Sequence, residues 1–529
     1  MRRTPIGRAV LAAALSSTVA LSMLGLTSLA PAGSAPAATA AAARAAGATV
    51  SDGCLQSVPE PGETAPVDIC WTLFAPAGAS RKRPVPLVVQ SHGWGGSRWT
   101  DAAQAQRFTD RGYGVLSFDQ RGFGESGGHA YVENPDLEGA DVRALVAMAA
   151  DLPWVQQDRK GDPRMGAIGG SYGGGYQFLM AFEEIRATGR QVVDALVPEI
   201  TWHDLEESLA PEGVVRTEWA LALSAGSLPS DALPWNVYKA LVEGAATGTW
   251  PDGSVPGTED MVTFMEKNGP KWQVGQGARI DVPVLFGQGT TDTLFPLEQA
   301  LTNWPVALTK KARKRSIFTA YNGGHVLPAV LPAGVTVDSD PCAEKLSGGD
   351  FTDLTLAFLD RALKGGRRTL RGYGRLHLAT PDSGCVSTRT VARRLDLPVG
   401  TVATTAAAGV PIAYEVAPGP VTVAGGSHLT ALATTIGVDA RAFYGLAIGT
   451  SPADAVLVQN NVLPFRAALP LVGEEVRIEL PAVGVEVPEG QSLFLLASPI
   501  SDTFVGMGSR TPGVVLLEDT VLHTAGRLR

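Results

Sequence analysis

One serine lies among five glycines in the stretch IGGSYGGGYQ, residues 168–177. The apolar run Met165–Ile168 has the length of a short buried strand, and Tyr176–Ile185 has a helical pattern. Glycine frees the backbone but contributes little packing, so five of them in so short a stretch require an explanation. The segment is either a loose surface loop or a strand-to-helix turn that is too tight for side chains.

Residues 169–173, Gly-Gly-Ser-Tyr-Gly, fit the pattern G-x-S-x-G of a nucleophile elbow. In such a turn the serine has a strained backbone, and the flanking glycines avoid collisions with the neighbouring strand and helix. Ser171 would present its hydroxyl at the carboxyl end of the sheet, and the backbone N–H of Tyr172 would face a developing oxyanion. The predicted strand and helix on either side favour this turn over the loose loop.

Short apolar runs alternate with helical stretches between about residues 50 and 363. This alternation predicts βαβ units and a mainly parallel sheet with helices on both faces. The runs of strand length are residues 86–90, 113–118, 165–168, 195–200, 282–287 and 315–320.

Two segments interrupt this rhythm and divide the chain. Residues 203–275 carry helical patterns without a strand signal, which predicts a helical cap. From residue 369 the chain is rich in Val, Thr, Gly and Pro in short alternating runs, which predicts a C-terminal β-sandwich of jelly-roll type over 369–529. We therefore expect an α/β core in two parts, residues 48–202 and 276–368.

The first 47 residues predict export. Arg2, Arg3 and Arg8 precede the apolar stretch Ala9–Leu26, and A-x-A sites and an Ala/Pro-rich linker follow up to residue 47. This is the layout of a secretory signal peptide. A membrane anchor is the alternative, but the Ser and Thr content and the A-x-A sites favour cleavage. We expect a secreted or periplasmic protein without stable membrane insertion.

Four cysteines, all beyond the predicted signal peptide, agree with export. An even number in an oxidising compartment predicts two disulfides, and three pairings are possible. We expect Cys54–Cys70 and Cys342–Cys385, because these partners are nearest in sequence. The spacing matches no zinc pattern, so no metal site is expected.

The composition excludes some classes of function. With 529 residues, the chain is longer than one hydrophobic core usually organises, and 45% hydrophobic with 18% charged residues is a globular composition. The net charge of −9 provides no basic surface. We therefore expect no nucleic-acid partner.

A serine nucleophile on such a turn needs an acid and then a histidine later in the chain. Of seven histidines, His325 in YNGGHVLP follows the predicted strand 315–320, where the base would lie. Asp292 follows the predicted strand 282–287 and would accept the second imidazole N–H. A solvated loop histidine and an Asx-turn aspartate are the alternatives. The order of the residues predicts a triad with Ser171.

A further oxyanion donor is expected from the loop SHGWGGS, residues 91–97, which follows the predicted strand 86–90. A glycine-rich loop exposes backbone N–H groups, and we expect that of Trp94 to act beside that of Tyr172. An ordinary tight turn is the alternative.

The motifs HGWGG, FDQRGFGESGG, GGSYGGGYQ, GTTDTLFP and GGHVLP occur in the order of an α/β-hydrolase. With the helical cap and a β-rich tail after FLDRALKG, the chain resembles the X-prolyl dipeptidyl-peptidase and cocaine-esterase family of serine hydrolases. The resemblance implies acyl transfer without a cofactor, with Ser171 as nucleophile, Asp292 as orienting acid and His325 as base. Those enzymes commonly place a tyrosine hydroxyl in the oxyanion hole from the loop that here reads SHGWGGS, which contains no tyrosine.

The resemblance implies a peptide or a small ester or amide as substrate. It favours a dipeptidyl-peptidase over a carboxylesterase of cocaine-esterase type. A free amino terminus would need a carboxylate, and the cap offers Asp204, Glu206 and Glu207, while Trp202 at its entrance would line the pocket. A charged helix face explains the three acidic residues equally well, and core packing explains Trp202 better than a place in the pocket. A cell-wall glycan-binding protein with an inert hydrolase core is the alternative from another class.

Overall fold

A computed structural model describes residues 47–327, 335, 337–366, 370–389, 394–406, 409–460 and 462–528. The predicted signal peptide and nearly all of its linker lie outside the described residues. Within the described part, no helix is both long enough and apolar enough to cross a membrane.

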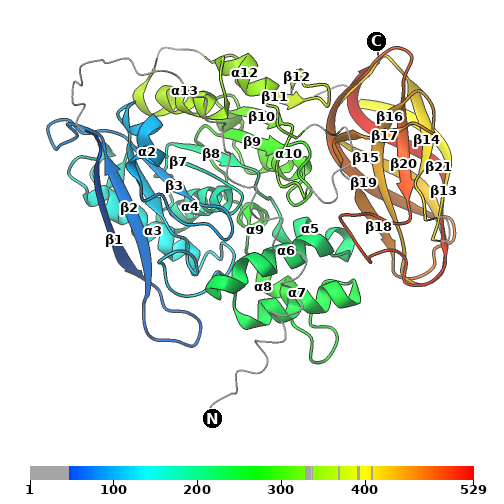
Figure 1. The fold of residues 1–529 in the computed structure, drawn as a ribbon, viewed down its shortest axis with the longest axis horizontal. Coiled ribbons are helices and arrows are strands. Elements are labelled where there is room, and N and C mark those ends of the chain that lie inside the picture. The colour runs from blue at the N-terminus through cyan, green and yellow to red at the C-terminus, as the bar shows by residue number, and fades with distance from the viewer. Residues whose placement is uncertain are drawn as a thin grey trace, which may run out of the picture.

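A ten-stranded sheet forms the centre of the larger part of the molecule (Figure 1). Its strand order is β1-β2-β4-β3-β7-β8-β9-β10-β11-β12, and every neighbouring pair from β4 to β11 is parallel. The predicted parallel sheet of an α/β-hydrolase is therefore confirmed. The strands are β1 Thr49–Ser57, β2 Val67–Ala75, β3 Leu87–Ser91, β4 Gly114–Phe118, β7 Met165–Gly170, β8 Ala195–Glu199, β9 Leu285–Gly289, β10 Ile317–Tyr321, β11 Arg375–Ala379 and β12 Cys385–Arg389.

Helices cover both faces of this sheet because the central strands are apolar on both sides. In β3, Leu87 and Val89 belong to one hydrophobic cluster and Val88 to another. The first cluster includes residues of α3, α4 and α10, and the second includes residues of α2, α12 and α13. The helices are α2 Ala102–Thr109, α3 Glu138–Asp151, α4 Tyr172–Thr188, α10 Leu297–Val306, α11 Lys310–Arg313, α12 Pro341–Ser347 and α13 Phe351–Lys364.

Five helices form the cap between β8 and β9, beside the core and the sandwich (Figure 1). The sequence predicts four helical segments here, residues 205–209, 214–225, 236–243 and 259–268. The last of these contains one short helix, and a fifth helix follows it. Asp260 caps the short helix, and Pro270 stands at the first position of the fifth. The cap helices are α5 Leu205–Leu209, α6 Thr217–Ser227, α7 Trp235–Thr247, α8 Met261–Met265 and α9 Pro270–Gly275.

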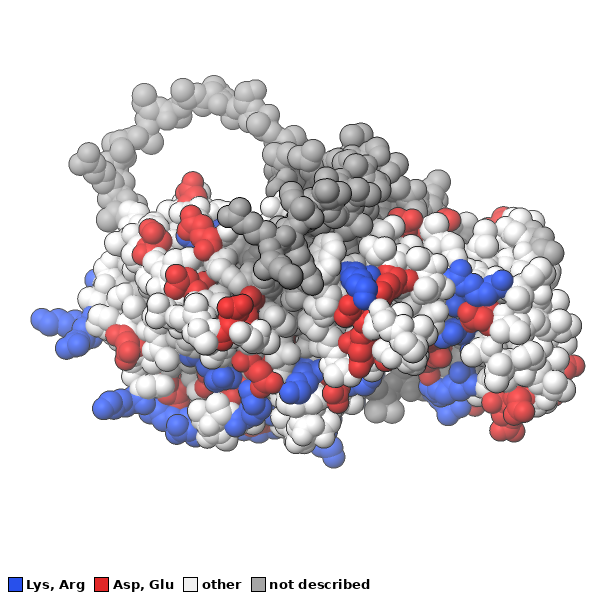
Figure 2. Space-filling model, turned by 90° about the horizontal axis from the view of Figure 1, so that it is seen from below, with Lys and Arg blue, Asp and Glu red and all other residues white. Residues whose placement is uncertain are grey.

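The C-terminal part is a β-sandwich with its own hydrophobic cluster. One sheet has the order β13-β21-β15-β19, and the other has the order β14-β20-β16-β17 with β18 paired to β16. Figure 2 shows acidic and basic side chains mixed over the visible face of core and sandwich alike. The strands are β13 Arg394–Thr405, β14 Ile412–Pro418, β15 Val421–Ile436, β16 Ala440–Gly449, β17 Val456–Leu457, β18 Leu463–Ala467, β19 Glu474–Val487, β20 Ser492–Ser498 and β21 Val514–Leu528.

The sandwich begins later than the sequence suggests. β11 pairs in parallel with β10 of the core sheet, with Phe318 opposite Leu376, and β12 pairs with β11. The expected boundary at residue 369 is therefore too early, and the first described strand of the sandwich is β13. Short alternating strands have the same pattern whether they extend an existing sheet or start a new one, which explains the error.

Antiparallel hairpins form both edges of the core sheet, and a disulfide ties down each of them. Cys54 lies opposite Cys70 across the β1–β2 hairpin, and the two are bonded. Cys342 in α12 is bonded to Cys385 in β12. Both expected pairings are thus found in the structure. A small further hairpin joins β5 Gln157–Arg159 to β6 Asp162–Pro163.

Candidate active site

Ser171 occupies the sharp turn between β7 and α4. Its φ of 59° and ψ of −122° lie outside the helical and extended regions. Its backbone N–H donates to the carbonyl of Glu199 at the end of the neighbouring strand β8, at 3.0 Å. The helix begins at Tyr172, four residues before the expected start, because the turn takes up a single residue.

The crowding around Gly169 shows why the turn contains glycines. Its φ is +146°, and a Cβ on it would lie 2.5 Å from the carbonyl oxygen of Gly173 and 2.8 Å from that of Ser91. A side chain at this position would therefore collide with the first turn of α4 and with β3. Of the two structures considered for residues 168–177, a tight strand-to-helix turn and a loose surface loop, the tight turn is the one observed.

Ser171, His325 and Asp292 come together in a hydrogen-bonded relay. His325 Nε2 lies 2.8 Å from Ser171 Oγ, and His325 Nδ1 lies 2.7 Å from Asp292 Oδ2. Ser171 follows β7, Asp292 follows β9 and His325 follows β10, all at the carboxyl ends of parallel strands. A shared sheet edge thus brings together residues that are far apart in sequence.

Asp292 is fully buried, and hydrogen bonds hold both of its carboxylate oxygens. Oδ1 accepts the backbone N–H groups of Leu294 and Phe295 at 2.9 and 2.7 Å. Oδ2 accepts the backbone N–H of His325 at 3.0 Å in addition to its ring N–H. Asp292 therefore forms an Asx-type turn and orients the imidazole at the same time, so the two interpretations of this residue do not exclude each other.

The loop that carries His325 approaches Asp292 closely at Gly324. Gly324 has a φ of +106°, and a Cβ on it would lie 2.6 Å from the Cβ of Asp292. The two loops are also joined through Thr293, whose backbone N–H donates to the carbonyl of His325 at 3.0 Å. The glycine thus permits the short distance between the carboxylate and the imidazole.

Two aromatic rings enclose the imidazole of His325, and the sequence analysis missed both. Phe295 and Trp219 stand perpendicular to it, with ring centroids 5.2 and 5.7 Å away. Trp219 belongs to the cap helix α6, and its Nε1 donates to the hydroxyl of Thr293 at 3.0 Å. Phe295 lies in the motif GTTDTLFP beside Asp292, which is a signal in the sequence, whereas nothing marks Trp219 among the tryptophans.

The expected oxyanion donors lie near Ser171 on two elements. A Cβ on Gly93 would lie 3.6 Å from the Cβ of Ser171, so the loop of residues 91–97 borders Ser171. Tyr172 is the first residue of α4, where a backbone N–H has no acceptor within the helix. The indole of Trp94 meets the ring of Tyr172 edge-on at 5.0 Å and donates to the carbonyl of Leu223 at 3.0 Å.

The expected substrate-binding residues of the cap have other partners. Trp202 is buried and donates from Nε1 to the carbonyl of Asn268 at 2.7 Å. Asp204 caps α5 and pairs with Lys271, whose Nζ lies 2.5 Å from its carboxylate.

Glu206 and Glu207 follow Asp204 in the first turn of α5. Partial burial raises the pKa of the Glu206 carboxyl, whereas Glu207 is exposed at the surface. Glu207 borders a pocket of about 160 Å³ that sandwich residues, among them Phe465, also line. Among the described residues, neither these two glutamates nor Trp202 and Asp204 form a hydrogen bond with the Ser171–His325–Asp292 relay.

A family model described as X-Pro dipeptidyl-peptidase (S15 family) matches residues 67–326. This segment contains most of the core strands, the cap and all three residues of the relay.

Solved structures of similar fold cover nearly the whole chain. A CocE/NonD family hydrolase from Staphylococcus aureus has a TM-score of 0.62 at 13% identity and covers 91% of this chain and 94% of its own. An aminopeptidase from a marine sediment Thaumarchaeota archaeon has a TM-score of 0.61 at 14% identity and covers 93% and 99%. An alpha-amino acid ester hydrolase has a TM-score of 0.58 at 13% identity and covers 92% and 98%. At these identities the likeness shows the shared fold.

Curated relatives match a shorter segment. An uncharacterized 31.7 kDa protein from the traX-finO intergenic region of Escherichia coli is 32% identical over 102 residues, which is 19% of this chain and 34% of that protein. The uncharacterized protein YcjY of Escherichia coli K12 is 26% identical over 132 residues, or 25% of this chain and 42% of YcjY. The chain thus spans between a third and a half of the length of these relatives. Residues 67–326, the core and cap, match the X-Pro dipeptidyl-peptidase (S15) family, and the chain as a whole shares the α/β-hydrolase fold of these enzymes.

Proposed function

We propose that the protein is an exported serine hydrolase that cleaves peptide or small ester and amide bonds through an acyl-enzyme on Ser171. The relay of 2.8 Å from Ser171 Oγ to His325 Nε2 and 2.7 Å from His325 Nδ1 to Asp292 carries this proposal. These distances fit direct proton transfer and a fixed imidazole tautomer.

The reaction proceeds in two halves. Ser171 Oγ attacks the substrate carbonyl carbon while its proton passes to His325 Nε2, and Asp292 stabilises the resulting imidazolium through the Nδ1–H bond. The tetrahedral intermediate then collapses, and the leaving amine or alcohol takes the proton from Nε2. A water molecule attacks the acyl-enzyme in the same way, losing a proton to His325, and Ser171 regains a proton as the acid is released.

The backbone N–H groups of Tyr172 and Trp94 are proposed to stabilise the oxyanion. The position of Tyr172 at the start of α4 supports its part, since that N–H is unused within the helix and lies at the positive end of the helix dipole. The packing of loop 91–97 against Ser171 supports the part of Trp94.

For the substrate class, the family match supports an X-Pro dipeptidyl-peptidase. The second candidate is an ester hydrolase, which the likeness to a CocE/NonD family hydrolase and an alpha-amino acid ester hydrolase supports. Export fits the N-terminal sequence and the two disulfides, which form in oxidising compartments.

A fluorophosphonate probe tests the nucleophile. We expect the wild-type protein to be labelled and Ser171→Ala to remain unlabelled, while Ser224→Ala, which removes another buried serine, keeps the label. Labelling of Ser171→Ala would refute the assignment. A panel of X-Pro anilides and short-chain nitrophenyl esters then separates the two substrate classes by kcat/KM.

A further inference from the structure

Arg216 is a fully buried cation at the start of the cap helix α6. Its side chain is among the largest in the interior, with 1% exposure. Its Nε donates to the carbonyl of Ser208 at 2.9 Å, and its backbone N–H donates to that of Leu209 at 2.8 Å. Its Nη1 is buried without a hydrogen-bond partner among the described residues. Burying a guanidinium costs free energy unless the group is paired and hydrogen-bonded, so the position of Arg216 requires an explanation.

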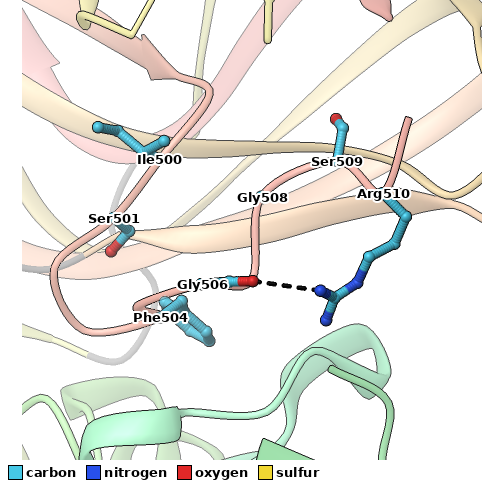
Figure 3. A pocket seen from close by; sticks show the side chains of 7 residues that line it. All are labelled: Ile500, Ser501, Phe504, Gly506, Gly508, Ser509 and Arg510. Carbon is cyan, nitrogen blue, oxygen red and sulfur yellow. Dashed lines mark hydrogen bonds between the residues drawn. The ribbon is translucent and has the colours of Figure 1, made fainter. Parts of the chain in front are cut away.

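The sandwich supplies the surface that covers this guanidinium. Arg216 Cζ lies 4.8 Å from the ring centroid of Phe504, in the loop between β20 and β21. Phe504 is itself buried, in a small cluster with Val214 of the cap and Phe443 of the sandwich. Figure 3 shows Phe504 pointing from this loop toward the cap, beside a pocket of about 280 Å³. A cation over an aromatic face is favourable, more so away from water.

Carboxylates from three elements face Arg216. They belong to Glu298 in α10, Glu207 in α5 and the relay residue Asp292. None of them forms a direct ion pair with Arg216 within the described part of the chain, and Glu298 Oε1 is buried without a partner. Burial lowers the pKa of Arg216 to about 10, so the side chain is still charged at neutral pH. The half-buried Tyr321 also faces Asp292, and desolvation raises the pKa of its hydroxyl further above neutral pH.

Helix α6 connects Arg216 to the other side of the relay. Trp219 lies three residues further along, on the same face of the helix. Its indole contacts the imidazole of His325 and its Nε1 donates to Thr293. The first turn of α6 is therefore fixed at one end by Phe504 and touches the acid–base pair at the other.

We propose that Arg216 is a positioning residue of the hydrolase, held in place by Phe504 of the β-sandwich. It sets the first turn of α6 against His325 and adds a positive charge near Asp292, so that full turnover at Ser171 depends on the sandwich. This inference rests on the proposed triad. A cation near the acid–base pair disfavours a second positive charge there, so we expect the removal of Arg216 to alter the pH profile of turnover.

Substitutions at Arg216 test the charge. In Arg216→Met we expect the midpoint of the acid limb of kcat/KM to rise by about 0.5–1 pH unit, with kcat reduced about tenfold and KM changed less than twofold. Arg216→Lys keeps the charge and should keep the wild-type midpoint, although its kcat falls. If Arg216 were purely structural, both Arg216→Met and Arg216→Lys would be less stable. The midpoint of the acid limb would then stay the same in Arg216→Met as in Arg216→Lys.

Phe504→Leu and Phe443→Leu test the sandwich with matched losses, because both rings belong to one cluster, with centroids 5.2 Å apart, and it is the ring of Phe504 that lies over Arg216. We expect kcat to fall several-fold in Phe504→Leu and to stay within twofold in Phe443→Leu, with thermal unfolding followed in both. Equal kcat values in Phe504→Leu and Phe443→Leu overturn the inference. This test holds even if Arg216→Met does not fold. So does an unshifted acid limb in a folded Arg216→Met. In both cases an inactive Ser171→Ala leaves the proposed function standing, whereas an active Ser171→Ala refutes the triad itself.

Discussion

The indole of Trp219 stands perpendicular to the imidazole of His325, with ring centroids 5.7 Å apart and an interplanar angle of 87°. This contact joins the cap to the end of strand β10. The indole N–H continues the connection by donating to Thr293, whose own backbone N–H holds the carbonyl of His325. The cap therefore does more than cover the site, because it contacts His325 and the loop that carries Asp292.

A double-mutant cycle measures this connection. Trp219→Phe and Thr293→Val each remove the 3.0 Å hydrogen bond while keeping most of the volume. A buried hydrogen bond contributes about 0.5–1.5 kcal/mol, so we expect each variant to lower kcat/KM up to about tenfold. Thr293→Val also removes the hydrogen bond that the Thr293 hydroxyl donates to the carbonyl of His325 at 3.2 Å, so the double variant should be hardly worse than Thr293→Val alone. Trp304→Phe is the control, since that buried Nε1 has no hydrogen-bond partner among the described residues. Fully additive effects would show that the two residues act separately.

The tight turn at Ser171 leads to a prediction about two glycines. Gly169 and Gly189 both have positive φ, but only Gly169 is crowded, whereas nothing lies within 4 Å of a Cβ on Gly189. We expect Gly169→Ala to destabilise the protein by about 3 kcal/mol or more and to abolish activity. Gly189→Ala should cost about 1 kcal/mol and keep kcat. Urea denaturation and steady-state kinetics measure both, and similar losses would mean that crowding at the turn is unimportant.

The sequence predicted that Ser171, Asp292 and His325 meet, because the carboxyl ends of parallel strands lie at one edge of a sheet. Ser171, Asp292 and His325 each follow a short apolar run, and this suffices to bring them to one edge. The sequence did not reveal that Trp219 and Arg216 lie beside the site, because their positions depend on which face of α6 turns toward the core. An apolar helix pattern does not distinguish packing against the cap from packing against the site.

The pairing of the strands at the two edges of the core sheet could not be predicted from the sequence, for a related reason. The β1–β2 hairpin and β11–β12 are short or mixed in polarity, and such patterns do not say which sheet a strand joins. The cysteines show only in part which sheet each edge strand joins. Cys385 pairs with Cys342 of α12, and this bond places β12 beside the core and not in the sandwich.

Asp194 makes stability depend on pH. Burial, followed by the nearby Asp158 and Asp162, raises its pKa from 3.8 to about 7, although the N–H of Met165 acts in the opposite direction. A carboxyl with a higher pKa in the folded chain favours folding while it is protonated. Its contribution is complete below about pH 3.8 and is lost as the pH rises to about 7.

Asp194→Asn imitates the protonated carboxyl at every pH. Near pH 4 we expect the free energy of unfolding of this variant to match that of the wild type. At pH 8 it should be higher than the wild-type value by about 2 kcal/mol, as measured by urea denaturation. Asp110→Asn, at the exposed end of α2, is the control and should show no such difference. An equal difference from the wild type at both pH values would show that Asp194 does not titrate in this range.

The carboxylate of Asp204 distinguishes a structural from a substrate-binding role in the cap. It accepts the N–H of Glu207 at the start of α5 and pairs with Lys271. Asparagine caps a helix about as well as aspartate, and exposed ion pairs contribute little, so Asp204→Asn should keep stability within about 1 kcal/mol. If the role is structural, KM for X-Pro anilides stays within twofold of the wild type. A tenfold rise in KM for the anilides, without one for nitrophenyl esters that lack an amino group, would instead show that Asp204 binds the substrate's ammonium group.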